Sequence, residues 1–433
     1  MCDEHRADLT GFMGNQIIRT PNLDRLAKTG VVFDNAYTPA PICIPARQCM
    51  MAGQYAKTCK CEVFGDDLTP GYMTFARQFS RYAYHTTVCG KLHHCGLDQM
   101  QGWTQRIGMD ANVSAAYIRE KNEKAFAEFV RPTSKVKWSQ AKEVKRAAPG
   151  AGHLRETDYY TIQGAIQYID QYFNDAWYDR EQTMTPLLLK ISLLKPHYPY
   201  FAEGERFKYY LNRVIPYLED VSFAHPALTI HRVKVGEDAS EREIRRATAA
   251  YYAMIEEADD QFGQILDALE RAGQNLDNWI VVYTSDHGEM LGQHGVWEKQ
   301  KFYEGSVRVP LMIRWPKRFA PRRVYQNVNL CDIFATLCDL AGIPIPDGLE
   351  SRSLTSLMRG ENENWNNETV SQYNGEHLMI KWDALKYQYY GEDLPEMLFD
   401  LTRNPEETVD FINDPLYGEV VQKFRKRRKE LGF

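Results

Sequence analysis

The feature of this sequence that most constrains its fold is a long amphipathic segment followed by an almost continuously apolar one. From Ala247 to Ala272 apolar residues recur at helical spacing, and Gly273 stands where such a helix would end. The next segment, Trp279 to Thr284, is apolar without alternation, which is typical of a strand covered on both faces. A helix that leads into such a strand predicts an α/β fold.

The same alternation recurs over the first three quarters of the chain. A helix is predicted from Thr20 to Gly30, with Thr20 as N-cap and Pro21 in its first turn, and a short strand follows at Val31 to Phe33. A second helix, Thr161 to Phe173, leads to a strand at Leu187 to Leu193. We therefore expect a large mixed sheet sandwiched by helices, in one domain that spans residues 1–364.

Two stretches depart from this pattern. Residues 101–152 are polar and irregular, and we interpret them as an excursion near the functional site. The composition changes near Trp365, and short strands such as Glu396 to Leu401 precede a final basic helix. These features predict a small C-terminal α+β subdomain over residues 365–433.

Composition excludes several classes of protein. With 44% hydrophobic and 25% charged residues the chain is typical of a globular protein, and no apolar run approaches the ~20 residues of a membrane span. A net charge of −6 argues against binding nucleic acid, so we interpret the basic cluster at 423–429 as a solvated helix face.

Cysteine usage and the chain start bear on localisation. The nine cysteines are odd in number and scattered from Cys2 to Cys338, which does not resemble a disulfide framework. No secretory signal opens the chain, so we expect a cytoplasmic protein. The first residues are already polar and motif-like, however, and the N-terminus looks truncated.

Polar groups collect at the ends of apolar segments, where open α/β sheets place their ligands. One such residue alone is usually a helix cap or a hydrogen-bond partner. Two carboxylates and a histidine together favour a metal site, and the accompanying lysines and histidines suit an anionic substrate. The groups are Asp3-Glu4, Lys91 to His93, Lys195 to His197 and Asp286-His287.

The sharpest signal is the pattern Cys-x-Pro-x-Arg from Cys43 to Arg47. It would arise by chance in a chain of this composition with a probability of about 0.03. The neighbouring segments must therefore show whether the pattern is a functional motif. It lies just downstream of the predicted helix at Thr20 to Gly30, and Gly53 follows it.

With these residues in place, the chain resembles the formylglycine-dependent sulfatases of the alkaline-phosphatase superfamily. The resemblance covers nearly the whole chain in the family's order, and within the family it is nearest to choline-sulfatase-like and phosphonate-monoester-hydrolase-like members. It runs through Thr20–Leu26, Cys43–Gly53, Gly90–His93, Lys195–Tyr200, Asp286–Lys299, Phe302–Pro310, Leu398–Leu401 and Asn404–Glu407.

The resemblance implies a modified nucleophile. In that family the signature cysteine, here Cys43, is oxidised to formylglycine by a formylglycine-generating or anaerobic sulfatase-maturating enzyme, and the aldehyde hydrates to a geminal diol. One diol oxygen attacks sulfur and expels the alcohol. The other then loses its proton, so that the aldehyde re-forms and sulfate leaves.

The resemblance also implies residue roles, carried over by position. The metal ligands would be Asp3, Asp286, His287 and modified Cys43, with Arg47 bracing the nucleophile. Sulfate oxygens and the leaving oxygen would be held by Lys91, His197 and Lys299, while His93 would assist deprotonation of the diol. Many sulfatases have Asp at the position of Glu4 and the two similar branches have Gln, so the role of Glu4 is left open. His94 matches no family role and is interpreted as structural.

Oxygen ligands favour Ca²⁺, and the imidazole leaves Mn²⁺ and Mg²⁺ open. The expected substrate is a small anionic sulfate ester of choline, an aryl alcohol or a carbohydrate, with no nucleic-acid or membrane partner and with homo-oligomerisation left open. A phosphonate or phosphate monoester hydrolase with the same residues is the alternative, because both anions are tetrahedral. A non-catalytic protein that has kept the fold is disfavoured by the intact set of site residues.

Overall fold

The computed structural model of the chain describes residues 1–108, 110, 122–125, 140–174, 185–218, 225–229 and 231–433. Its central sheet has two hydrogen-bonded parts, one in the order β7-β8-β1-β9 and one in the order β3-β2-β5. The strands are β1 (Val31–Tyr37), β2 (His85–Gly90), β3 (Gln105–Ile107), β5 (Leu187–Ser192), β7 (Val281–Thr284), β8 (Arg308–Arg314) and β9 (Arg322–Asn329).

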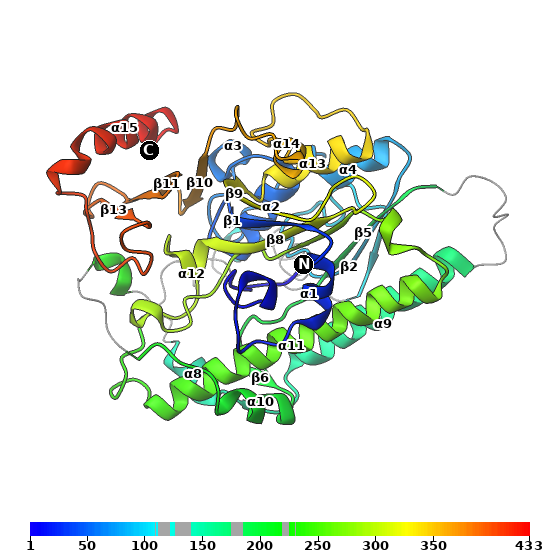
Figure 1. Cartoon of the computed structure of the whole chain (residues 1–433), viewed down its shortest axis with the longest axis horizontal. Coiled ribbons are helices and arrows are strands. Elements are labelled where there is room, and N and C mark those ends of the chain that lie inside the picture. Colours follow the sequence, from blue (N-terminus) through cyan, green and yellow to red (C-terminus); the bar gives the residue numbers. More distant parts are fainter. Residues whose placement is uncertain (109, 111–121, 126–139, 175–184, 219–224, 230) are drawn as a thin grey trace.

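Residues 1–3 join the two parts. The amide of Cys2 donates to the carbonyl of Thr284 at the end of β7 (3.0 Å), and the carbonyl of Met1 accepts from Leu193 just after β5 (3.0 Å). Strand β8 is antiparallel to β1 and β7, whereas β1 and β9 are parallel, as are β2 and β5. The predicted mixed sheet is therefore confirmed (Figure 1).

Helices cover both faces of this sheet, because successive side chains of a strand point to opposite sides. Val32 of β1 packs in a core with α1 (Pro21–Ala27), α9 (His153–Asn174) and α11 (Glu241–Arg271). Its neighbours Val31 and Phe33 belong to a core on the other face. That face is covered by α2 (Cys43–Ala52), α3 (Ala56–Cys59), α4 (Phe75–Arg81), α13 (Asp332–Ala341) and α14 (Thr355–Arg359).

Several predicted boundaries were wrong. Helix α11 begins at Glu241 rather than Ala247, where Ser240 and Glu243 form a reciprocal capping box. Helix α9 begins at His153 rather than Thr161, β1 continues to Tyr37, and β7 begins only at Val281.

The predicted irregular excursion at 101–152 was wrong in part. Strand β3 within it pairs in parallel with β2 and extends the sheet, and α8 (Ala141–Arg146) packs near α11. Residues 111–121 and 126–139 of that stretch lie outside the described residues. The other short elements are β4 (Ala148–Pro149), β6 (Phe201–Ala202), α10 (Gly204–Leu211), α12 (Glu304–Val307), and the 3-10 turns η1 (Gly11–Met13), η2 (Pro226–Thr229), η3 (Leu276–Asn278), η4 (Gln293–Gly295) and η5 (Pro415–Tyr417).

The C-terminal unit, residues 368–433, is an antiparallel sheet with one helix against it. Its strands follow chain order: β10 (Glu368–Tyr373), β11 (His377–Trp382), β12 (Leu385–Tyr390) and β13 (Met397–Asp400). Phe424 of helix α15 (Gly418–Glu430) stacks on Trp382, with ring centroids 4.3 Å apart. The interpretation of the basic cluster as solvated holds for its lysines only, since Arg425, Arg427 and Arg428 pair with Glu396 or Glu368.

Three charged residues fasten the C-terminal unit to the rest of the molecule. The ammonium of Lys386 in β12 lies 2.9 Å from a carboxylate oxygen of Glu304, the first residue of α12, and also contacts Glu407. Lys386 and Glu407 are fully buried, and Tyr37 of β1 donates to Glu304 at 3.1 Å. We call Lys386, Glu304 and Glu407 the charge clasp.

Two further findings concern the whole molecule. All nine cysteines are buried and unbridged. Within the described part of the chain, no helix combines the length and the apolarity needed to cross a membrane.

Candidate active site

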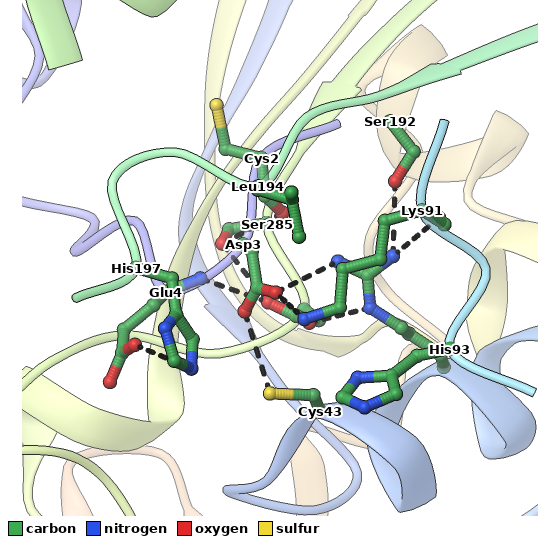
Figure 2. A network of polar contacts seen from close by, with 12 residues as sticks. Cys2, Asp3, Glu4, Cys43, Lys91, His93, Ser192, Leu194, His197 and Ser285 are labelled. Atoms are coloured by element: carbon green, nitrogen blue, oxygen red, sulfur yellow. Dashed lines mark hydrogen bonds and ion pairs between the residues drawn. The ribbon is translucent and has the colours of Figure 1, made fainter. Parts of the chain in front are cut away.

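Cys43 is the first residue of α2, directly after β1 and its loop. Ile42 before it is extended and ends the loop, so the thiol lies at the positive end of a ten-residue helix. Its Sγ is 3.1 Å from Nε2 of His287. It is also 3.5 Å from a carboxylate oxygen of Asp3, as Figure 2 shows. Burial, reinforced by the charge of Asp3, raises the pKa of the Cys43 thiol to about 12.

Four predicted metal ligands converge on one point. The donor atoms of Asp3, Cys43, Asp286 and His287 all lie within 4.8 Å of one another, and all four residues are buried. Asp286 and His287 follow the end of β7, and Asp3 is the last residue of the segment that joins β5 to β7, so the sheet itself brings them together.

The donors in this cluster fit a divalent cation. Nδ1 of His287 lies 2.9 Å from the carbonyl of Gly288, which accepts a hydrogen bond from it. The lone pair of Nε2 is then free to face the cluster. Two carboxylates and one imidazole are a donor set for a hard or borderline divalent cation.

Arg47, one turn after Cys43, ties the cluster to the surrounding strands. Its Nε donates to Asp286 at 2.7 Å, and its Nη1 donates to the carbonyl of Lys91 (2.9 Å) and the hydroxyl of Ser192 (3.0 Å). The side chain is 1% exposed. A guanidinium with several fixed acceptors holds both its own orientation and that of Asp286.

Lys91, at the end of β2, forms a buried ion pair with Asp3. Burial disfavours the charged form of both residues, but for each of them the neighbouring charges together have the larger effect on the pKa. The pKa of Lys91 is raised by Asp3, and the pKa of Asp3 is held well below its usual range by Lys91, then by His197 and Arg47. The cluster therefore has charged groups of both signs at neutral pH.

His197 and Lys299 form a second pair beside this cluster. Nδ1 of His197 lies 2.6 Å from the carbonyl of Tyr198, which accepts from it, so Nε2 is left to accept from the ammonium of Lys299 at 3.0 Å. Burial and the charge of Lys299 lower the pKa of His197. The pKa of Lys299 is raised by Glu4 in spite of burial, so in this pair the lysine carries the proton.

His93 is held by its backbone. Its φ is +65°, and its amide donates to the carboxylate of Asp110 at 2.9 Å. Its ring packs edge-on against Phe64. Burial and then the charge of Lys91 lower the pKa of His93, so the ring lies within electrostatic range of the cluster and is neutral at pH 7. His94 lies 3.3 Å from the carbonyl of Gln99, as a structural residue would.

The structure brings every predicted site residue into this one region, and three contributors had not been assigned. Ser192 ends β5, and the rule that polar residues at strand ends form sites could have found it. Asp110 lies in the polar stretch 101–152 and has no local sequence signal. Glu4, whose role was left open, contacts Lys299 and His197.

Two family models and several curated relatives match this chain. A family model described as Sulfatase matches residues 1–343, and one described as N-sulphoglucosamine sulphohydrolase, C-terminal, matches residues 292–432. An arylsulfatase of Clostridium perfringens is 30% identical, over 98% of this chain and 92% of that protein. A choline-sulfatase of Rhizobium meliloti is 28% identical, over 92% and 78% respectively.

The fold has solved counterparts. The crystal structure of a phosphonate monoester hydrolase of Agrobacterium radiobacter superposes with a TM-score of 0.80 at 22% identity, over 99% of this chain and 94% of that one. At that identity the likeness shows the fold alone.

Proposed function

Because this chain belongs to the sulfatase family of sulfuric ester hydrolases, we propose that it hydrolyses a sulfate monoester to an alcohol and inorganic sulfate through an oxidised Cys43. The observation that carries this proposal is the convergence of Cys43 with Asp3, Asp286 and His287 in one buried cluster. The substrate class is a small anionic sulfate ester.

The environment of Cys43 supports its modification. With a pKa of about 12 the thiol stays protonated at neutral pH and is a poor nucleophile. Formylglycine at this position, made by a formylglycine-generating or anaerobic sulfatase-maturating enzyme, would supply an oxygen nucleophile instead.

A divalent metal, Ca²⁺ in our proposal with Mn²⁺ and Mg²⁺ as alternatives, would be held by Asp3, Asp286, His287 and residue 43. It would act as a Lewis acid on the sulfate ester. Arg47 pairs with Asp286 and Lys91 pairs with Asp3, and these contacts would orient the two carboxylates for it.

The remaining residues act on the substrate. Lys91 and Lys299 are charged donors, so they suit the sulfate oxygens and the charge that grows on the leaving oxygen. His197 accepts from Lys299 and fixes its direction. The neutral ring of His93 is able to accept a proton from residue 43 when sulfate is released.

The test is co-production of the chain with a maturation enzyme, followed by mass spectrometry of the Cys43 peptide and assays on aryl, choline and carbohydrate sulfates. We expect formylglycine in the active preparation, and no activity in Cys43→Ala. Activity from protein in which Cys43 is wholly unmodified would contradict the proposal.

The second candidate is a phosphonate or phosphate monoester hydrolase, favoured by the fold shared with the Agrobacterium enzyme. Both substrates present a tetrahedral anion to the same cations. Relative kcat/KM on an aryl sulfate and on the matching aryl phosphonate monoester separates the two, and a clear preference for the phosphonate would replace our assignment.

A further inference from the structure

Glu4 follows Asp3 in the chain, yet its carboxylate points elsewhere. Its φ of +67° turns the backbone, so that its amide donates to Asp286 at 3.0 Å while its side chain leaves the cluster. Both carboxylate oxygens are 3.1 Å from the ammonium of Lys299, and one is 3.4 Å from Nε2 of His197. Figure 2 shows the Glu4 carboxylate beside His197, whereas Asp3 faces Cys43.

The Glu4 carboxylate lies apart from the cluster of predicted metal ligands. Glu4 lies outside the four residues whose donor atoms gather around Cys43, and it groups instead with Asp3 and His197. In that second group each carboxylate already faces an ammonium, Lys299 on Glu4 and Lys91 on Asp3. The Glu4 carboxylate is therefore engaged by Lys299 beside the cluster around Cys43 rather than within it.

We propose that Glu4 is a positioning residue that orients Lys299, and through it His197, toward the leaving oxygen, and that it does not bind the metal. A lysine has a flexible four-carbon stem and three rotatable donors, so its direction has to be imposed by its partners. Glu4 is fully buried and both of its carboxylate oxygens lie 3.1 Å from the Lys299 ammonium, so it fixes the direction of that group. The kinetic part of this proposal rests on sulfate ester hydrolysis, and the metal-binding part does not.

The first test measures metal content per chain in Glu4→Ala and in Asp3→Ala. We expect Glu4→Ala to retain the metal content of the wild type and Asp3→Ala to lose it. Loss of metal in Glu4→Ala, or a second metal in the wild type that disappears in this variant, would overturn the proposal. Alanine is the informative replacement, because the amide oxygen of glutamine is itself a metal donor.

The second test is steady-state kinetics on two aryl sulfates, one with a good and one with a poor leaving group. For Glu4→Ala we expect kcat on the poor leaving group to fall by about 10- to 100-fold, the range typical of residues that orient a functional group, with KM almost unchanged. The loss on the good leaving group should be much smaller, because that group needs little help from Lys299.

Glu4→Gln keeps the volume and one acceptor for Lys299, so it should fold like the wild type and show the same pattern with a smaller loss. An equal loss on both substrates in Glu4→Gln would overturn the positioning role. If the matured wild type hydrolyses no sulfate ester, the proposed function fails, while the metal content of Glu4→Ala still decides whether Glu4 is a ligand.

Discussion

The inner and outer halves of the site are built differently. The inner half, around Cys43, has donors that are 2% exposed or less and that come from strand ends and from the first turn of α2. The outer half is formed by loops. The His197 side chain is 19% exposed, and Lys299 lies between two residues with left-handed backbone, Glu298 (φ +70°) and Gln300 (φ +69°). The sheet therefore fixes the inner half, and a few side-chain contacts fix the outer half.

The largest effect should follow from removing an inner ligand. We expect Asp286→Ala and His287→Ala to lose the metal and to reduce activity by more than about a thousandfold, since both lie in the cluster around Cys43. Metal analysis and steady-state assays of the same preparations provide the measurement. Asp277→Ala, which removes an exposed carboxylate before β7, is the control that should retain the metal. Full metal content in both site variants would place the metal elsewhere.

Removing an outer residue should have a smaller effect that depends on the substrate. Loss of one donor to developing charge typically costs about 100- to 1000-fold in rate, and we expect this for Lys299→Ala on an aryl sulfate with a poor leaving group. We expect a loss of the same kind for His197→Ala, because His197 accepts from Lys299 and fixes its direction. The fall should be in kcat rather than in KM. Small and equal effects on good and poor leaving groups would show that the two halves are not divided in this way.

Arg47→Lys tests the inner half while it keeps the positive charge at position 47. Lysine cannot reach the three acceptors that Arg47 holds, so Asp286 loses a fixed partner. We expect metal affinity to weaken by about 10- to 100-fold, as for other residues that orient metal ligands. Titration with Ca²⁺ measures this affinity. The control is Arg314→Lys, which makes the same change at a buried arginine outside the site and should leave the metal affinity unchanged. An equal loss of affinity in the two variants would contradict a specific role of Arg47 at the metal site.

The smallest effect on catalysis is expected for replacing Lys301, a residue of the outer half that lies two positions after Lys299. Unlike the paired charges of the inner half, its charge is buried without a charged partner among the described residues. Lys301 is 3% exposed, yet no carboxylate of the described residues lies within ion-pair distance, and its ammonium contacts only the carbonyl of Gln300 at 3.4 Å. Burial lowers the pKa of Lys301 from 10.5 to about 8. Below pH 8 the folded state carries an unpaired buried charge, so folding stability should rise between pH 8 and 10.5, where the unfolded chain binds more protons.

Lys301→Met removes this cost, so its stability gain over the wild type should be largest below pH 8 and should shrink by roughly 3 kcal/mol as the pH rises through that window. Denaturant unfolding of both proteins at several pH values measures the difference. Lys423→Met on the exposed face of α15 should show no such trend. A gain that is independent of pH would mean that Lys301 has the same pKa in the folded and the unfolded state.

The sheet and the place of the inner half could be predicted because their signals are local, whereas the roles of Asp3, Cys43 and Arg47 came from the resemblance. Strand β7 is apolar without a break, and Asp286 and His287 stand directly after it. The first turn of α11 was missed because its polar residues face solvent and carry no apolar periodicity, although Ser240 and Glu243 gave a capping signal. Strand β3 is short and partly exposed, so hydrophobicity did not reveal it.

The outer half could be assigned only by resemblance. Nothing in the sequence around His197 or Lys299 shows that the two side chains meet, because loop conformation decides it. The direction of the Glu4 side chain depends on the positive φ of this residue. A glutamate in the sequence gives no indication of a positive φ. The pairing of the α15 arginines with Glu368 and Glu396 likewise depends on where the helix docks.

The charge clasp has a consequence for how the protein unfolds. Lys386 contacts Glu304 of the large part and Glu407 of the C-terminal unit. Glu304 lies five residues after Lys299, so the clasp is close in sequence to the loop that carries Lys299. Undocking the unit would break the ion pair between Lys386 and Glu304, which joins the two parts of the molecule. Denaturation should therefore be a single cooperative transition, in which the substrate-binding loop and the C-terminal unit lose their structure together, and limited proteolysis should release no stable fragment that ends near residue 365.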